Sequence, residues 1–217
     1  MIEETIKNKS DWIKVRNTGI GASEASAIVG MNPYMTNIEL WQYKTGLLEP
    51  EDISDKPYVK YGTEAEQYLR ALFALDYPQY EVGYKEYDLI RNEKYPFIFA
   101  TLDGRLIEKS TGRKGIYEGK TTEILKSMQR EKWKDTVPDN YYIQLLHQFL
   151  ATGWDFAYLK AQLKYDFDGE IRLDTRHYPV ERSEVEEDLE YLLEEEIKFW
   201  NNYVLKKKKP PLILPEI

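Results

Sequence analysis

Apolar and polar positions divide the chain into a helical beginning, a run of strands and a mixed second half. The apolar spacing after Ser10 predicts a short helix, and Ser23 is the expected N-cap of a second helix that ends at Gly30. Thr36 and Gly46 have the residue types that begin and end a third. The first part of the chain is therefore expected to be helical.

A longer helix is predicted at residues 58–75, after an acidic loop at 50–57. Its expected apolar face consists of Tyr61, Ala65, Tyr68, Leu69, Leu72 and Phe73. Aromatic and β-branched residues then predict strands at 80–84, 87–91 and 97–102. This order places a sheet directly after the helical portion.

The second half alternates between the two kinds of element. Helices are predicted at residues 123–133 and 139–152, the latter between an Asp139 cap and a Gly153 stop. Two strands, 156–165 and 171–180, are expected to form a hairpin that turns at Asp168-Gly169. The whole order predicts an α+β fold with a mixed sheet flanked by helices.

The segment 181–196 holds nine acids and one base, so it accounts for a charge of −8, equal to the net charge of the chain. The acids are Glu181, Glu184, Glu186, Glu187, Asp188, Glu190, Glu194, Glu195 and Glu196. Apolar residues at helical spacing between them predict an amphipathic helix whose acids form a solvated outer face. The other residues sum to about zero, so the net charge does not exclude a nucleic-acid partner.

The 217 residues contain no repeat and no Gly/Ser- or Pro-rich linker, which favours one domain over residues 1–217. It would have a helical N-terminal portion (about 10–75) and a C-terminal acidic helix and tail (about 181–217), with a solvated lysine run at 206–209. The absence of cysteine excludes disulfides, thiolate zinc sites and iron–sulfur clusters, and two histidines are too few for an all-histidine metal site. No apolar run is long enough for a membrane span and no signal peptide is visible, so a cytoplasmic protein is expected.

Acidic residues with metal-binding potential lie in the central strands. Residues 97–108 and 114–120 are expected to pair about a turn at 110–114, which would bring Asp103 near Glu118. Glu118 and Lys120 share one face of their strand, because successive side chains alternate. Adjacent carboxylates favour a hard divalent cation such as Mg²⁺. A solvated hairpin with a surface ion pair would show the same residues.

Several motifs in a fixed order add to this pattern. They are Arg16 and Ser23 seven residues apart, Asn32-Pro-Tyr34 with Glu39-Leu-Trp41 and Lys44-Thr-Gly46, Gly62-Thr-Glu64-Ala-Glu66, Asp103 with Glu118-Gly119-Lys120, and Tyr141 with Gln144. From about residue 11 to 199 the chain resembles the lambda exonuclease family, the YqaJ-type viral recombinase nucleases of the PD-(D/E)xK superfamily. It departs from the pattern at Leu102, where a proline is often found.

The resemblance implies a restriction-endonuclease-like core and an active site. Asp103 would bridge two Mg²⁺ ions, for which Mn²⁺ could substitute, and Glu118 and the Gly119 carbonyl would complete one metal site. Glu66, favoured over Glu64 by its position in the motif, would assist the other. Lys120 would position the nucleophile.

The resemblance also implies substrate-binding residues. Gln144 would support the substrate or a metal-bound water, with Tyr141 on the same helix. Arg16 and Ser23 would anchor a terminal 5′-phosphate, joined by Thr101. His147 is interpreted as structural, and Gln148 shares the face of Gln144.

The implied function is a Mg²⁺-dependent 5′-to-3′ exonuclease acting on double-stranded DNA ends, in a bacterial or phage-infected cell. Its products would be 5′-mononucleotides and a 3′ single strand, suited to a single-strand annealing recombinase, and a trimer would be the expected oligomer. Two alternatives stay open. One is an endonuclease or a nuclease of the RecB or Cas4 type, and the other is a catalytically silent DNA-end-binding module.

Overall fold

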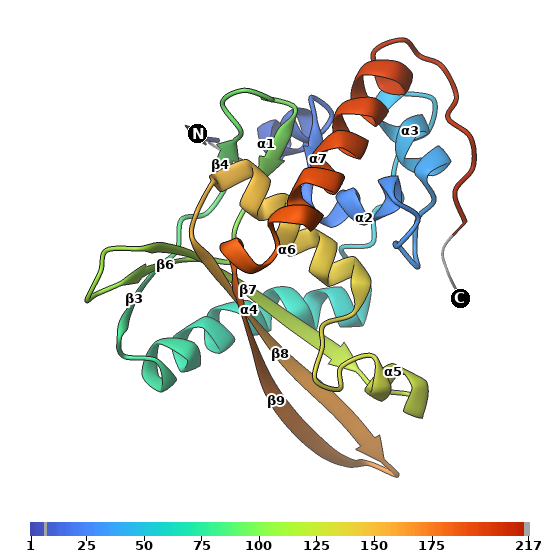
Figure 1. The fold of residues 1–217 in the computed structure, drawn as a ribbon. Coiled ribbons are helices and arrows are strands. Elements are labelled where there is room, and N and C mark those ends of the chain that lie inside the picture. Colours follow the sequence, from blue (N-terminus) through green and yellow to red (C-terminus); the bar gives the residue numbers. More distant parts are fainter. Residues whose placement is uncertain (7, 215–217) are drawn as a thin grey trace.

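The computed structural model describes residues 1–6 and 8–214, which fold into two sheets and the helices around them (Figure 1). The strands are β1 (Ile2–Thr5), β2 (Ile20–Gly21), β3 (Tyr80–Gly83), β4 (Asp88–Arg91), β5 (Ile98–Ala100), β6 (Gly104–Glu108), β7 (Lys114–Glu123), β8 (Phe156–Phe167) and β9 (Glu170–Glu181). The helices are α1 (Lys9–Arg16), α2 (Ala25–Ile28), α3 (Asn37–Thr45), α4 (Pro57–Asp76), α5 (Ser127–Glu131), α6 (Asp139–Thr152) and α7 (Glu186–Phe199). Short helical turns at Ala22–Glu24, Arg182–Glu184 and Trp200–Val204 join them.

The larger sheet has the strand order β3-β6-β7-β8-β9, and the smaller has β1-β4-β5-β2. Strands β7 and β8 are parallel, as are β2 and β5, whereas the other pairs are antiparallel. A parallel pair needs a crossover, and the one between β7 and β8 contains α5 and α6. The mixed sheets flanked by helices confirm the predicted α+β class.

Alternation along β7 places the two main layers of helix on opposite faces of the larger sheet. Ile116 packs into the core with Phe149 of α6, whereas Tyr117 packs with Phe73 of α4. Figure 1 shows β7 and β8 running between these two helices. Residues that alternate along β7 therefore face different helices.

Local signals predicted several boundaries correctly. Thr36 caps α3, its side chain accepting from the Glu39 N–H, and Gly46 ends the helix with φ of 73°. Gly153 ends α6 in the same left-handed conformation. The β8–β9 hairpin turns at Asp168 and Gly169 as predicted.

The structure contradicts other local predictions. β7 continues to Glu123, where a helix was predicted, because these residues pair with β8 as far as Lys164, and α5 is short. Ser23 lies within the turn Ala22–Glu24 and is not the N-cap of α2. The Glu24 carboxylate there accepts from the Gly21 N–H at 2.8 Å.

Two more predicted features need correction. Asp139 is the first residue of α6, and its cap is Pro138 without a side-chain bond. On the expected apolar face of α4 only Leu69 and Phe73 are buried, while Tyr61, Tyr68 and Leu72 are exposed. The helix meets the sheet along one narrow line of residues, so its remaining apolar side chains lie outside the core.

Glu196 overturns the expectation that every acid of residues 181–196 is solvated. It is fully buried, and its Oε1 lies 2.6 Å from Nδ1 of His147, which is also fully buried. The other ring nitrogen, Nε2, lies 2.9 Å from the Phe99 carbonyl. Both nitrogens face acceptors, so the geometry suits the doubly protonated imidazolium. This contact joins α6, α7 and the smaller sheet.

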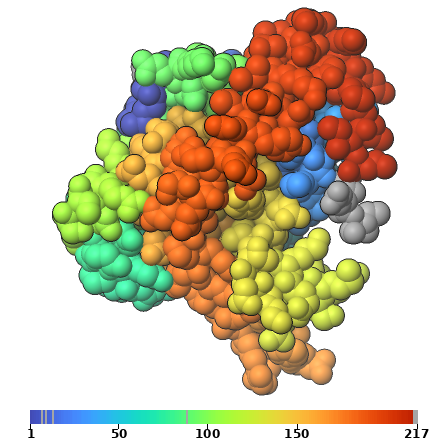
Figure 2. Space-filling model, viewed as in Figure 1, coloured from blue at the N-terminus to red at the C-terminus, as the bar shows by residue number. Residues whose placement is uncertain are grey.

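The C-terminal segment folds back over the N-terminal helices. Asn37 is buried, and its Nδ2 donates to the Pro211 carbonyl at 2.7 Å while its Oδ1 accepts from the Ile213 N–H at 3.1 Å. The lysines at 206–209 are exposed, as predicted, and the end of the predicted tail lies outside the described residues. Figure 2 shows this segment and α7 covering one face, with the β8–β9 hairpin projecting beyond the body.

Every helix among the described residues is too short or too polar to cross a bilayer.

Candidate active site

Glu118 and Lys120 form a close ion pair on β7. Their strand alternation turns both toward α6, and Lys120 Nζ lies 2.6 Å from Glu118 Oε1. The Glu118 side chain is only 2% exposed and that of Lys120 is 20% exposed. The pair is therefore not the solvated surface contact that the sequence left open.

Two amides of α6 hold the Glu118 carboxylate. Gln144 Nε2 donates to Oε1, and Gln148 Nε2 donates to Oε2, each at 2.6 Å. Residues four apart on a helix lie one above the other, which explains why both reach the same group. The sequence pointed to Gln144 as functional, and the four-residue spacing was the signal that Gln148 would join it.

Asp103 lies directly before β6 and next to this pair. Gly104 pairs with Tyr117, so Asp103 is at the level of Glu118, and its Oδ2 accepts from the Gly119 N–H at 2.9 Å. Arg70 Nη1 donates to the Asp103 backbone carbonyl at 2.6 Å. Arg70 was not predicted from the sequence, although it lies four residues after Glu66 on α4, a spacing that places both on one face.

The charges of this site are not balanced. Burial and then the charge of Glu118 raise the pKa of Asp103 well above its usual range, and the same two causes raise the pKa of Glu66. Burial lowers the pKa of Lys120, but Glu118 and Asp103 outweigh it and the net shift is upward. Glu66 is half-buried and interacts electrostatically with Glu118 and Lys120, whereas Glu64 is exposed. Three carboxyl groups thus share one ammonium.

The residues of this site have the chemistry that a divalent cation requires. Asp103, Glu118 and Glu66 offer oxygen ligands, the kind that Mg²⁺ prefers, and their surplus negative charge would be neutralised by it. Within the described residues, however, no group of three or more acidic or histidine side chains is already gathered in metal-binding positions. The Glu118 carboxylate is instead contacted by the N–H donors of Lys120, Gln144 and Gln148. The chemistry fits a hard cation, with the carboxylates as ligands.

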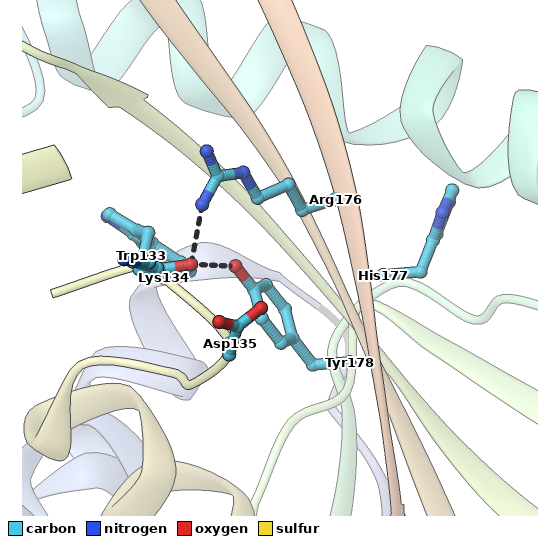
Figure 3. A pocket seen from close by; sticks show the side chains of 6 residues that line it. All are labelled: Trp133, Lys134, Asp135, Arg176, His177 and Tyr178. Carbon is cyan, nitrogen blue, oxygen red and sulfur yellow. Dashed lines mark hydrogen bonds between the residues drawn. The ribbon is translucent and has the colours of Figure 1, made fainter. Parts of the chain in front are cut away.

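Tyr141 extends the site toward a surface pocket. Lys120 Nζ lies 5.2 Å from the centre of the Tyr141 ring, which packs at 5.5 Å on Trp133. Trp133 lines a pocket with Lys134, Asp135, Arg176, His177 and Tyr178. Figure 3 shows Arg176 and Tyr178 both donating to the Trp133 carbonyl, each at 2.6 Å. The loop before α6 is thereby fixed to β9.

The predicted phosphate-binding residues lie on the N-terminal elements. Arg16 pairs with Glu24 at 3.4 Å, and buried Lys44 pairs with the same carboxylate at 2.7 Å. Burial would raise the pKa of Glu24, but these two cations lower it overall. Ser23 is exposed at the adjoining turn. The two cations, Arg16 and Lys44, share one anion, Glu24, so the cluster has a net charge of +1.

Thr101 is half-buried in the segment that joins β5 to β6, two residues before Asp103. Among the described residues no hydrogen bond links it to Arg16 or Ser23.

The larger sheet is mixed and lies between α4 and α6. It carries Asp103 directly before β6 and the acid-x-lysine pair Glu118 and Lys120 on β7. This arrangement defines a restriction-endonuclease-like core of the PD-(D/E)xK type. The model of the YqaJ-like viral recombinase domain matches residues 11–155, and the chain belongs to that family. It is 30% identical over 206 residues to the uncharacterized protein YqaJ of Bacillus subtilis (strain 168). That match covers 94% of this chain and 59% of the relative's length.

Solved structures share the fold at low identity. The alkaline exonuclease LHK-Exo from Laribacter hongkongensis matches with a TM-score of 0.60 at 19% identity, over 92% of this chain and 97% of that one. A phage-related exonuclease from Haemophilus somnus 129PT matches with a TM-score of 0.56 at 16% identity, over 87% and 96% of the two chains. Family and fold together support a nuclease function.

Proposed function

We propose that the chain is a Mg²⁺-dependent exonuclease that degrades one strand of duplex DNA from its 5′ end. The observation that carries the proposal is the contact of Asp103 with Gly119 beside the buried Glu118–Lys120 pair. A binding module would not need like charges concentrated at one buried point. The solved exonucleases that share the fold add support for this reaction.

In this reaction the oxygen of water bonds to the phosphorus, and the bond from phosphorus to the 3′ oxygen breaks. A divalent cation, when bound by Asp103, Glu118, Glu66 and the Gly119 carbonyl, would activate the water and stabilise the leaving oxygen. Lys120 is held in its ammonium form and would orient the nucleophile and steady the phosphate charge. Gln144 fixes the Glu118 carboxylate.

End recognition would rest on the N-terminal cluster. Arg16, with Ser23 at the adjoining turn, would bind the terminal 5′-phosphate, because a guanidinium binds phosphate oxygens in pairs. Thr101 and Tyr141 would contact the same strand nearer Asp103 and Lys120. The phosphate would compete with Glu24 for Arg16.

The products would be 5′-mononucleotides and a 3′ single strand. A single-strand annealing recombinase is the proposed partner for that strand, and a homotrimer is the proposed oligomer. The chain spans 59% of the length of the YqaJ relative. The proposals therefore apply to this chain and not to the remaining part of that relative.

The test is digestion of end-labelled blunt duplex with and without a 5′-phosphate, with closed circular DNA as a second substrate. We expect labelled mononucleotides from the 5′ end, faster with the phosphate, and an intact circle. EDTA should stop the reaction, and Ca²⁺ should permit binding without cleavage, because Mg²⁺ requires the stricter octahedral geometry.

Three results would contradict the proposal in different ways. Cutting of the circle would indicate an endonuclease. End binding without cleavage in Mg²⁺ or Mn²⁺ would indicate a silent module. Full activity without metal would remove the cation from the site.

A further inference from the structure

Tyr117 has a buried hydroxyl whose place in the fold is unusual. Its ring belongs to the aromatic cluster between α4 and the larger sheet, 5.0 Å from Phe73, and the residue is fully buried. Among the described residues the hydroxyl has no hydrogen-bond partner. A buried polar group without a partner is destabilising, and phenylalanine would fill the same space without it.

The hydroxyl lies beside the carboxylates. Tyr117 and Gly119 share a face of β7, and a Cβ placed on Gly119 would be 3.6 Å from the Tyr117 hydroxyl and 3.8 Å from Asp103 Oδ2. The glycine therefore leaves a space that the phenol and the carboxylate both border. A phenol is a hydrogen-bond donor at neutral pH, so the hydroxyl can donate to an oxygen in that space.

We propose that Tyr117 is a further catalytic residue, whose hydroxyl donates a hydrogen bond to an oxygen, of water or of phosphate, bound beside Asp103 and Gly119. The inference rests on the proposed nuclease function and adds a donor on the α4 side of the strand. Lys120 is the donor on the α6 side. Each face of β7 would thus contribute one donor to the site.

The test compares Tyr117→Phe with Tyr77→Phe. Tyr77 stacks on Phe73 in the same cluster at 4.6 Å, but it follows the end of α4 and its ring packs on Tyr158 of β8 and His177 of β9, so it serves as the control. Single-turnover cleavage of 5′-phosphorylated duplex and the thermal midpoint, with and without Mg²⁺, are measured for both. Tyr117→Phe should cleave about ten- to a hundredfold more slowly, as expected for one hydrogen bond to a charged group. Its midpoint without metal should equal or exceed that of the wild type.

The two sources of the bound oxygen give different results. If the oxygen belongs to water around a bound cation, the Mg²⁺-induced rise of the midpoint should shrink in Tyr117→Phe. If it belongs to phosphate, that rise should be unchanged while DNA binding in Ca²⁺ weakens. Tyr77→Phe should resemble the wild type in every measurement.

Two outcomes would overturn the inference. One is wild-type cleavage by Tyr117→Phe, and the other is a fall in its midpoint that accounts for the lost activity. If the wild-type chain does not cleave DNA, the proposed function fails by itself. The Mg²⁺ midpoint and Ca²⁺ binding measurements would then still decide whether Tyr117 contacts a bound oxygen.

Discussion

Helix α6 carries two buried polar clusters with opposite charge balance. On one side His147 and Glu196 match one cation with one anion, and the second ring nitrogen meets a carbonyl. On the other side Gln144 and Gln148 hold Glu118, which shares its surroundings with Asp103, Glu66 and the single ammonium of Lys120. The first cluster pairs its charges within the protein and joins its layers, although Glu196 Oε2 has no hydrogen-bond partner among the described residues. The second has more carboxyl groups than cations, a balance that a bound cation would offset.

The strongest test of this contrast removes members of the unbalanced cluster. Asp103→Ala, Glu118→Ala and Lys120→Ala should each reduce cleavage by orders of magnitude, because these groups act together on the transition state. Single-turnover rates measure the loss, and circular dichroism melts should show folded protein. Glu64→Ala, an exposed neighbour on α4, is the control and should cleave normally. Near wild-type turnover at saturating Mg²⁺ would remove that residue from the site.

The balanced cluster should show the reverse pattern. Glu196→Ala leaves the His147 imidazolium buried without its anion, and breaking a buried pair of this kind typically costs about 3–5 kcal/mol. Urea unfolding measures the loss, and the Mg²⁺ dependence of cleavage by the folded fraction should not change. A double variant, His147→Leu with Glu196→Leu, should lose less, because it leaves no unpaired charge. A single variant as stable as the wild type would show that the pair adds nothing to the fold.

End recognition provides a smaller test, at a third cluster. Arg16→Ala should reduce the preference for 5′-phosphorylated over 5′-hydroxyl duplex roughly ten- to a hundredfold, the value of one charge-assisted contact. The rate ratio between the two substrates is measured for wild type and variant. An unchanged ratio would mean that Arg16 only supports Glu24, and that the end is recognised elsewhere.

The smallest effect is a dependence of stability on pH. Burial lowers the pKa of His147, but Glu196 and the Phe99 carbonyl outweigh it and raise the pKa above its usual range. A raised folded pKa stabilises the protein below the unfolded pKa of about 6.5, and this contribution is lost as pH rises through the folded value. The slope cannot exceed about 1.4 kcal/mol per pH unit for one proton. Unfolding free energies at pH 6 and 9 should differ more for the wild type than for Glu196→Ala. Equal differences would assign the slope to other groups, such as Asp103.

Features set by neighbouring residues could be predicted from sequence. Thr36 begins and Gly46 ends α3 through contacts within one turn. The hairpin of β6 and β7 brings Asp103 close to Glu118 through a short connection. The acid and acid-x-lysine pattern could be found for this reason.

Features that depend on residues distant in the chain could not be predicted from the sequence. Glu123, predicted to begin a helix, is extended because it pairs with Lys164 of β8, some forty residues further on. Glu196 looks like its solvated neighbours until His147 is placed beside it. Tyr117 has the sequence pattern of a core residue, and only the structure places its hydroxyl beside the space at Gly119.

The bond between Asn37 and the segment at Pro211 and Ile213 also sets an order in time. During synthesis, helix α3 leaves the ribosome long before the residues that satisfy its buried amide exist. Chains generally fold from the N-terminus as they emerge, yet here the partners of the buried Asn37 side chain are made only when translation reaches residues 211 and 213. The N-terminal layer should therefore stay open to proteases until translation passes that point.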